Sequence, residues 1–600
     1  MLKHDPVRLK TKKRFVVGVD FGSTGSGFAI ALVNGDDIFS PKTYECAPNE
    51  TYRKNLSAIM YDRGVRFQYG FRAQNTHFYA DDDDDKESSD GEEATRSTSS
   101  APSLISAKSF EEKDRREYFT DLKLKFMQNP ESEYVVDRVT LTKKSIVDII
   151  ADYLAMLLEH IMQLLHNADS SATMQDIRWC FSVPSHYDEK KIHLMREIAY
   201  KAKYISNVNA PEDDFMIVTE PEAASIYCLK NMAQMKKGVK EGETFMIMDA
   251  GGGTVDITCY EMKKGRLREL TIQNGNICGS KKLDEEFMKV LDENLDSGFI
   301  TFKRDFPESL LKLLQYWEDK KRNVKVMDKI KVEAPPAMDK VDNAYPSSGF
   351  FNKTRRGNNI SLSKEHVQRI FDKVVPNILR LVDDQVEQFK KENRDRKVDY
   401  LFMVGGLSDN LYLQDMIKTQ YGSMFKDIVF PTCSGNSVIQ GGALLGKDPS
   451  LIRSRRAKLT YGISVMDDFD PEHHPESKYY YEGGRHLCKD IFEVFVERGQ
   501  EVDEDHTIQK EYDAVNDHVT IRLFSSPYKA KDVPFVDTVG RIQHLEDIII
   551  PFPDKTSNDK RIIVKMQFGK AEILITAENA QGQKKEVQKK FEQESLSLIK

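Results

Sequence analysis

The residues best suited to chemistry lie between Met246 and Tyr260, where an aspartate precedes a run of glycines. An apolar segment ends at Asp249 and alternation of apolar and polar residues resumes at Val255, so the pattern predicts a β-hairpin. Its tip contains Gly251, Gly252, Gly253 and Thr254. Glycines let backbone N–H groups approach an anion closely, and threonine adds a hydroxyl donor. The stretch therefore favours a phosphate-binding turn, although an ordinary hairpin turn would also explain the glycines.

A second stretch of the same design lies between Arg14 and Leu32. Its apolar strand ends at Asp20, and a returning strand begins at Phe28. Its tip contains Gly22, Ser23, Thr24 and Gly25. Two strand-terminal carboxylates that lie close together need a cation between them, and hydrated Mg²⁺ suits such an oxygen-rich site. We therefore expect Asp20 and Asp249 to hold Mg²⁺ through water, beside a polyphosphate.

A third glycine turn follows a buried-looking strand at residues 400–404 and contains Gly405, Gly406 and Leu407. This order of turns resembles the superfamily of actin, sugar kinases and the heat-shock seventy-kilodalton chaperones. The segments VPSHYDEKK from Val183, VTEPEAASIY from Val218 and YWEDKKRNV from Tyr316 resemble those of the chaperones. Two further segments, RSRRAKLTYGIS and MQFGKAEILITA, resemble the divergent twelve-type heat-shock proteins.

The resemblance implies an α/β fold, namely an actin-like, two-lobed ATPase of duplicated ribonuclease-H-like folds that binds ATP or ADP with Mg²⁺. It also implies that Glu220 and Asp256 place the attacking water, and that Glu318, Lys321 and Arg322 contact the adenosine. From the residues alone, Glu220 could equally be a carboxylate at a helix N-terminus, where the dipole favours it. The three charges at 318, 321 and 322 could likewise be the solvated face of a helix.

Three departures from the family pattern bear on activity. Gln74 stands where the family has a lysine, and a neutral side chain cannot stabilise the reacting phosphoryl group in the same way. The loop Gly279-Ser280-Lys281 replaces paired glycines, with Asp284 on an acidic family position. Asp409 or Asn410 replaces an arginine that stacks on adenine. We therefore expect slow hydrolysis and weakened adenine contact.

Composition excludes several classes of protein. A chain of 600 residues is too long for one core and predicts two or more domains. The net charge of −8 gives no basic excess that would indicate nucleic acid as a partner. The seven cysteines form no CxxC pair, which favours a reducing compartment over zinc or disulfides. No stretch approaches the roughly 20 apolar residues of a membrane helix, and the first residues lack a secretory signal. We expect a cytoplasmic, soluble protein without a membrane span.

The chain divides into five predicted parts. These are a tail at 1–13, an actin-like nucleotide-binding domain at 14–450, a short basic linker at 451–458, a β-rich domain at 459–585, and a helical or disordered tail at 586–600. The acidic stretch at 81–103 is predicted to be a disordered insertion, and its serines and threonines make it a candidate for phosphorylation. Because the family linker is apolar, we do not expect the basic one to dock in the same way.

Hydrophobic periodicity predicts the principal elements. The stretch 145–166 has apolar residues at three-and-four spacing and predicts a core helix. The stretch 364–391 predicts one long helix with a kink at Pro376. From Leu459 onward, apolar residues alternate, which predicts an antiparallel β-sandwich resembling the polypeptide-binding domain of the family. A helical lid is expected to be absent or reduced, so clients would be released quickly.

These features favour an ATP-binding, chaperone-like heat-shock protein of the stress response, with slow hydrolysis and with unfolded polypeptides or co-chaperones as partners. One alternative is a non-hydrolysing nucleotide-binding scaffold for signalling partners. A second is a sugar kinase of the same superfamily, which would need a pocket for a small acceptor.

Overall fold

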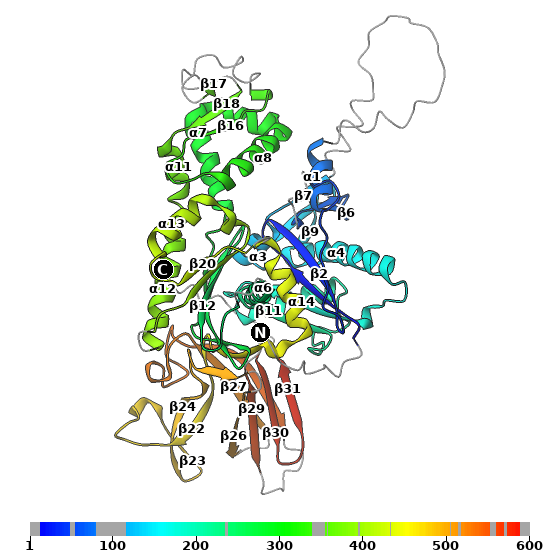
Figure 1. The fold of residues 1–600 in the computed structure, drawn as a ribbon. Coiled ribbons are helices and arrows are strands. Elements are labelled where there is room, and N and C mark those ends of the chain that lie inside the picture. Colours follow the sequence, from blue (N-terminus) through cyan, green and yellow to red (C-terminus); the bar gives the residue numbers. More distant parts are fainter. Residues whose placement is uncertain are drawn as a thin grey trace, which may run out of the picture.

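The computed structural model is a mixed α/β structure. It describes residues 13–47, 54–79, 116–234, 238–338, 355–356, 358–393, 396–431, 434–503, 506–513, 518–551, 560–568 and 573–588. The predicted insertion at 81–103 and most of the two predicted tails lie outside these residues. Figure 1 shows blue and cyan elements on one side, a green sheet beside them, and orange and red strands below both.

The N-terminal sheet carries the first predicted hairpin. Its order is β11-β10-β1-β2-β3, with β4 paired to β2. These strands are β1 (Phe15–Asp20), β2 (Gly25–Leu32), β3 (Ile38–Phe39), β4 (Asn55–Leu56), β10 (Ile177–Val183) and β11 (Phe215–Thr219). Strand β1 runs parallel to β10 and antiparallel to β2, so Asp20 lies at the end of a strand that is buried along its whole length.

The central sheet repeats this design. Its order is β20-β19-β12-β13-β14-β21-β25, with β15 paired to β13. These strands are β12 (Thr244–Ala250), β13 (Val255–Lys263), β14 (Arg266–Glu269), β15 (Asn274–Asn276), β19 (Tyr400–Val404), β20 (Asp427–Val429), β21 (Ile452–Arg456) and β25 (Glu501–Asp503). Strand β12 runs parallel to β19 and antiparallel to β13, as β1 does to its neighbours. The predicted hairpin at 246–260 is therefore confirmed.

Two helices fill the space between the sheets. They are α6 (Glu220–Gln234) and α14 (Ser437–Lys447), whose apolar residues share one core with β11, β12 and β19. Gly441 is required where α14 crosses α6, because a Cβ there would collide with the carbonyl of Ala223. The first residue of α6 is Glu220, so this packing fixes a predicted site residue at the meeting of the two sheets.

The outer face of the N-terminal sheet is covered by α4 (Ile146–Ala168) and α5 (Glu189–Lys201). Ser145 caps α4 by accepting from the N–H of Asp148, which confirms the helix predicted at 145–166. Smaller elements beside it are α1 (Gly70–Tyr79), α3 (Leu122–Gln128), β5 (Ile59–Asp62), β6 (Val65–Tyr69), β7 (Arg116–Phe119), β8 (Glu133–Asp137) and β9 (Thr142–Ser145).

A group of helices covers the central sheet and rises above it in Figure 1. It consists of α7 (Lys281–Asp305), α8 (Pro307–Asn323), α11 (Lys364–Phe371), α12 (Val375–Glu392) and α13 (Leu411–Tyr421), with β16 (Ile330–Glu333), β17 (Arg355–Arg356) and β18 (Asn359–Leu362). The single kinked helix predicted at 364–391 is instead two helices. Pro376 lies in the first turn of α12, where its missing N–H costs no hydrogen bond.

The C-terminal part consists of two antiparallel sheets that share one apolar core. The first has the order β23-β24-β22-β27-β28 and the second β26-β29-β30-β31. These strands are β22 (Thr460–Asp468), β23 (Tyr479–Glu482), β24 (Arg485–Val496), β26 (Thr507–Asp513), β27 (His518–Ser526), β28 (Gln543–Pro551), β29 (Arg561–Gln567), β30 (Leu574–Asn579) and β31 (Lys584–Gln588). The alternation along β29 buries Ile562, Val564 and Met566, as the sequence pattern predicted.

Residues 452–456, expected to be a linker, form strand β21 of the central sheet. This strand pairs with β14 on one side and with β25 on the other. Polar contacts hold it, since Arg455 Nε donates to Glu222 at 2.5 Å and Ser454 Oγ donates to Glu501 at 2.8 Å. We had expected no docking of this kind, because a basic segment does not suit an apolar groove. The segment docks instead through paired charges. Among the described residues, no helix has the length and apolar character needed to cross a membrane.

Candidate functional site

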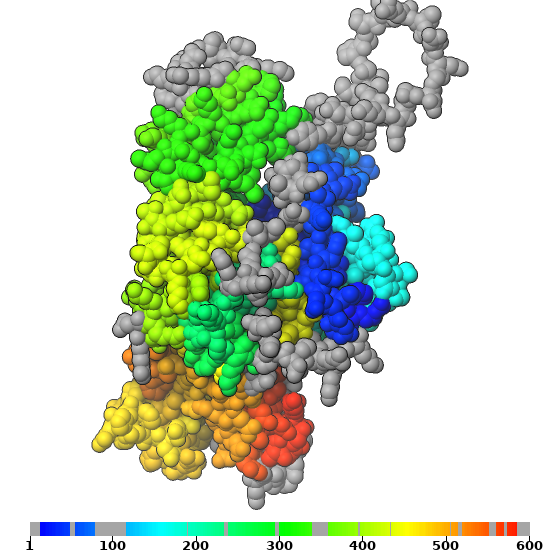
Figure 2. All heavy atoms as spheres, in the orientation of Figure 1, coloured from blue at the N-terminus to red at the C-terminus, as the bar shows by residue number. Residues whose placement is uncertain are grey.

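A cavity of about 1480 Å³ lies between two halves of the structure, namely the N-terminal sheet with its helices and the central sheet with its helices. Figure 2 shows the green residues of α7 and α8 to the left of the blue residues of the N-terminal part, and residues of both groups line the cavity. The predicted residues that line it are Asp20, Gly22, Ser23, Thr24, Gly25, Glu220, Asp249, Gly251, Gly252, Gly253, Thr254, Glu318, Lys321, Arg322, Gly405, Gly406 and Leu407. Asp256 is fully buried and is not among the lining residues. The structure thus brings together almost all of the residues that the sequence singled out.

The two hairpin tips touch each other at this cavity. A Cβ on Gly252 would collide with the side chain of Thr24, and one on Gly253 would collide with Ser23. Glycine is therefore required here by close approach. Backbone groups of both tips lie within reach of one ligand, as an anion-binding site requires.

The second tip is supported by the turn before α7. Backbone N–H groups donate from Gly279 to Gly253 at 3.0 Å and from Lys281 to Gly252 at 2.9 Å. Ser57 supports the first tip, since its Oγ donates to the carbonyl of Gly22 at 2.6 Å. Both tips are thus fixed in place by neighbouring elements rather than by their own turns alone.

Four buried carboxylates lie beneath the tips, on Asp20, Glu220, Asp249 and Asp256. Asp249 faces Asp256 across the hairpin. Burial raises the pKa of Asp249, and the negative charge of Glu220 raises it further. Burial also raises the pKa of Glu220, against the charge of Lys123. A cluster of this charge needs cations, because like charges in a buried site disfavour ionisation.

Two lysines supply positive charge that the sequence reasoning missed. Lys54 Nζ donates to Asp20 Oδ2 at 2.5 Å, and Lys123 forms an ion pair with Glu220. Although burial opposes it, the charges of Lys54 and Lys123 lower the pKa of Asp20. Neither lysine lies in a motif, since Lys54 precedes β4 and Lys123 lies in the first turn of α3. Their position could be found only from the fold.

Gln74, which the sequence analysis aligned with the family lysine, also lines the cavity. Arg72, a nearby cation, does not, because its guanidinium is largely exposed and lies 3.8 Å from Glu45. Among the described cations that line the cavity, Lys54 and Lys123 are the ones that pair with carboxylates of the buried cluster, Asp20 and Glu220.

The far end of the cavity is lined by α8 and by the turn after β19. Glu318 accepts from Arg322 Nε at 2.9 Å, while Lys321 Nζ is buried between Glu318 and Asp284. The two residues expected to replace the family arginine, Asp409 and Asn410, also line the cavity. Asp409 accepts from Ser434 Oγ at 2.9 Å, whereas Asn410 is buried and caps α13. Both residues line the cavity, but the side-chain oxygen of Asn410 is used in capping α13.

The third glycine turn lies against the carboxylate cluster. Gly405 has φ +86° and lies so close to Asp249 that a Cβ would collide with the carboxylate. A residue with a side chain would be strained at this φ as well. The turn therefore fixes the orientation of Asp249.

The donor set fits a hydrated divalent cation. Among the described residues, no three His, Cys, Asp or Glu side chains lie close enough to coordinate an ion directly. Asp256 Oδ2 is buried and has no hydrogen-bond partner among the described residues, while Oδ1 accepts from the N–H of Ser185 at 2.9 Å. An unpartnered buried oxygen near the carboxylates of Asp249 and Glu220 suits bound water, and oxygen donors suit Mg²⁺.

Comparisons with known proteins agree with the sequence motifs. A family described as a domain of unknown function (DUF8340) matches residues 239–421. Heat shock 70 kDa protein 12B of Homo sapiens is 25% identical over 94% of this chain and 88% of its own length. Heat shock 70 kDa protein 12A of Mus musculus is 25% identical over 96% of this chain and 90% of its own. Chaperone protein DnaK of Ureaplasma parvum serovar 3 is 22% identical over 57% of this chain and 53% of its own.

The match to the twelve-type proteins extends over nearly the whole chain, whereas the match to DnaK covers little more than half of it. This is the pattern that the quoted motifs predicted. The resemblance is confirmed: over nearly its whole length the chain is similar to divergent, twelve-type members of the heat-shock seventy-kilodalton family.

Proposed function

We propose that the protein is a chaperone-like ATP-binding protein that hydrolyses ATP slowly. The observation that carries the proposal is the meeting of two glycine hairpins, buried carboxylates and two lysines at one cavity. The heat-shock and chaperone names of its relatives support the same function. In this proposal, the two sheets of repeated strand order form the two lobes of an actin-like ATPase at 14–450.

The N–H groups of both tips, with the hydroxyls of Ser23 and Thr24, bind phosphate oxygens. Asp20 and Asp249 accept hydrogen bonds from water around Mg²⁺, and Glu318 and Arg322 face the nucleoside. When bound, Mg-ATP supplies a phosphoryl group whose charge the cation partly offsets. Glu220 accepts a hydrogen bond from the attacking water, which its raised pKa suits to proton transfer.

Lys54 and Lys123 stabilise negative charge that develops near the hairpins, which is the role that Gln74 cannot fill. Both lysines already pair with a carboxylate, so less of their charge is free for the phosphoryl group. This sharing accounts for the slow hydrolysis that we propose.

The C-terminal sheets at 459–585 form a β-sandwich that binds polypeptide clients. The support is the apolar core shared by the two antiparallel sheets together with the similarity to heat shock proteins. Peptide binding at a sheet of this kind would use main-chain hydrogen bonds. The strand pairing of β21 with β25 gives a route by which the nucleotide-binding part and the C-terminal part influence each other.

A non-hydrolysing nucleotide-binding scaffold is the second candidate. The neutral Gln74 in the cavity and the pairing of both lysines with carboxylates favour it. The two candidates agree on nucleotide binding and differ on phosphate release.

Calorimetric titration with Mg-ATP, followed by phosphate release on the same samples, tests the proposal. Asp249→Asn should abolish or strongly weaken binding. Asp305→Asn is a matched control, because Asp305 lies at the end of α7 and pairs with the neighbouring Arg304. Wild-type binding with slow release supports the chaperone-like ATPase. Binding without release supports the scaffold, and no binding by the wild type rejects both.

A further inference from the structure

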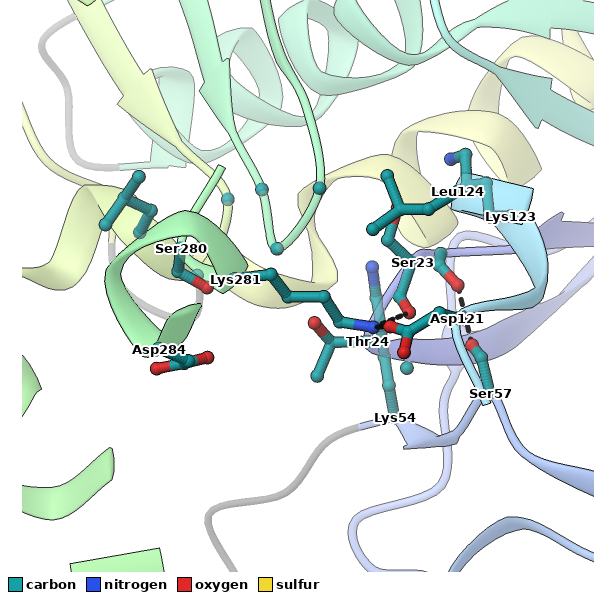
Figure 3. A pocket seen from close by; sticks show the side chains of 18 of the residues that line it. Ser23, Thr24, Lys54, Ser57, Asp121, Lys123, Leu124, Ser280, Lys281 and Asp284 are labelled. Carbon is teal, nitrogen blue, oxygen red and sulfur yellow. Dashed lines mark hydrogen bonds and ion pairs between the residues drawn. The ribbon is translucent and has the colours of Figure 1, made fainter. Parts of the chain in front are cut away.

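An ion pair joins the two halves of the structure at the cavity. Lys281 is the first residue of α7, and its Nζ pairs with the carboxylate of Asp121, the residue before α3. The same Nζ donates to the carbonyl of Ser23 at 2.9 Å. Figure 3 shows the lysine extended from its helix toward Asp121 and Ser23, with Thr24 beside it. The contact therefore connects α7 to the first phosphate hairpin and to α3.

Both partners are held by their backbones. The N–H of Lys281 donates to Gly252 at 2.9 Å, which ties the residue to the tip of the second hairpin. Asp121 has φ 60° and ψ 27°, a left-handed conformation that few residues with side chains adopt. The pair therefore links two fixed points, one on each side of the cavity.

The carboxylate of Asp121 is committed to this contact. Asp121 occupies the N-cap position of α3, where an aspartate usually accepts a hydrogen bond from the helix N-terminus. Its side chain makes no such bond. Instead, Oδ1 faces Lys281 and Oδ2 accepts from Thr120 Oγ1 at 3.2 Å. The carboxylate of Asp121 thus pairs with Lys281 in the other half and not with the N-terminus of its own helix.

We propose that the Lys281–Asp121 pair is a latch that sets the rate at which nucleotide leaves the cavity. This inference rests on the proposed nucleotide binding. Release requires the two halves to separate at the hairpins, and that movement must first break the ion pair and the bond to Ser23. Both side chains line the cavity and are partly exposed, so the pair lies at its rim.

The decisive variant is Asp121→Asn. Asparagine tolerates the left-handed conformation, so the turn before α3 is retained. A latch predicts faster release of nucleotide, on the order of tenfold, because removing one partner of a paired charge acts mainly on dissociation. If Lys281 served only as a cation for phosphate, freeing it from Asp121 would slow release. The two roles therefore predict opposite changes.

Stopped-flow displacement of a fluorescent ADP measures the dissociation rate. Lys281→Ala should also speed release, and the double variant should be no faster than Lys281→Ala alone. Lys282→Ala is the matched control, because the described ion pair of Lys282 lies along its own helix, with Glu285 at 2.7 Å, and Lys282 does not line the cavity.

Unchanged or slower release from Asp121→Asn, with normal binding by the wild type, would reject the latch and leave the proposed function standing. Failure of the wild-type protein to bind the fluorescent ADP would reject both. A thermal melt of each variant confirms that it is folded before its rate is compared.

Discussion

At the scale of single residues, the site depends on where positive charge is placed. The sequence alignment led us to expect a family lysine at position 74, but the fold brings Lys54 and Lys123 to the carboxylates from two other segments. The charge near the reacting group is thus supplied from different positions of the chain. Residue 74 alone does not decide whether the site can stabilise a transferring phosphoryl group.

Lys54→Ala should lower phosphate release by roughly 10² to 10³, the usual effect of removing one preorganised electrostatic group. Asp20 keeps a hydrogen bond from Ser182 Oγ at 3.3 Å, so the strand should remain in place. The measurement is single-turnover phosphate release at saturating ATP. Arg72→Gln is the control, because that cation lies outside the cavity. Equal losses in both variants would contradict the role of Lys54.

Glu269 makes stability depend on pH. Burial raises its pKa from 4.5 to about 7, with the charge of Glu222 adding and the N–H of Arg456 opposing. Between these values the folded state keeps a proton that the unfolded state has lost, so stability falls as pH rises from 4.5 to 7. Glu269→Gln mimics the protonated form at every pH and retains an acceptor for Arg456.

The variant should therefore gain stability over the wild type as pH rises from 5 to 8, by about 1–3 kcal/mol at the upper end. Thermal midpoints of both proteins across this range are the measurement. Parallel pH profiles for the two proteins would show that Glu269 does not titrate as its burial implies.

At the scale of elements, the first turn of α6 connects the site to strand β21. Glu220 faces the carboxylate cluster, while Glu222 on the same turn accepts from Arg455 Nε. Glu222 Oε2 also accepts from the N–H of Thr219, which caps the helix. Displacing the strand would therefore leave a buried carboxylate with one partner fewer, two residues from the proposed water-binding group.

Arg455→Met should lower the free energy of unfolding by about 3–5 kcal/mol, because it leaves the charge of Glu222 buried without its partner. Chemical denaturation followed by tryptophan fluorescence measures the loss. Adding Glu222→Gln should recover part of it, since the double variant no longer buries a lone charge. A double variant less stable than Arg455→Met would argue against the pair as the cause.

At the scale of the whole molecule, local sequence patterns were sufficient to predict those elements whose geometry depends on neighbouring residues alone. The hairpins at Asp20 and Asp249 and the helix capped by Ser145 follow from glycine runs and apolar spacing. Pro376 was misjudged because a kink and a helix start share one local signal, and packing decides between them. Lys54, Lys123 and the pairing of Arg455 with Glu222 join segments far apart in sequence, so no local pattern could reveal them.

The docking of β21 has a consequence for proteolysis. Four basic residues lie within six positions, namely Arg453, Arg455, Arg456 and Lys458. In an open linker, the peptide bonds that follow them would be readily cut by trypsin. A protease must bind its substrate as an extended strand, but here both edges of that strand are already paired, with β14 and with β25. Limited digestion of the wild type should spare this segment, whereas the Arg455→Met variant should be cut at its remaining basic residues. Cleavage of this basic run is thereby a reporter of whether the central sheet and the C-terminal part are joined.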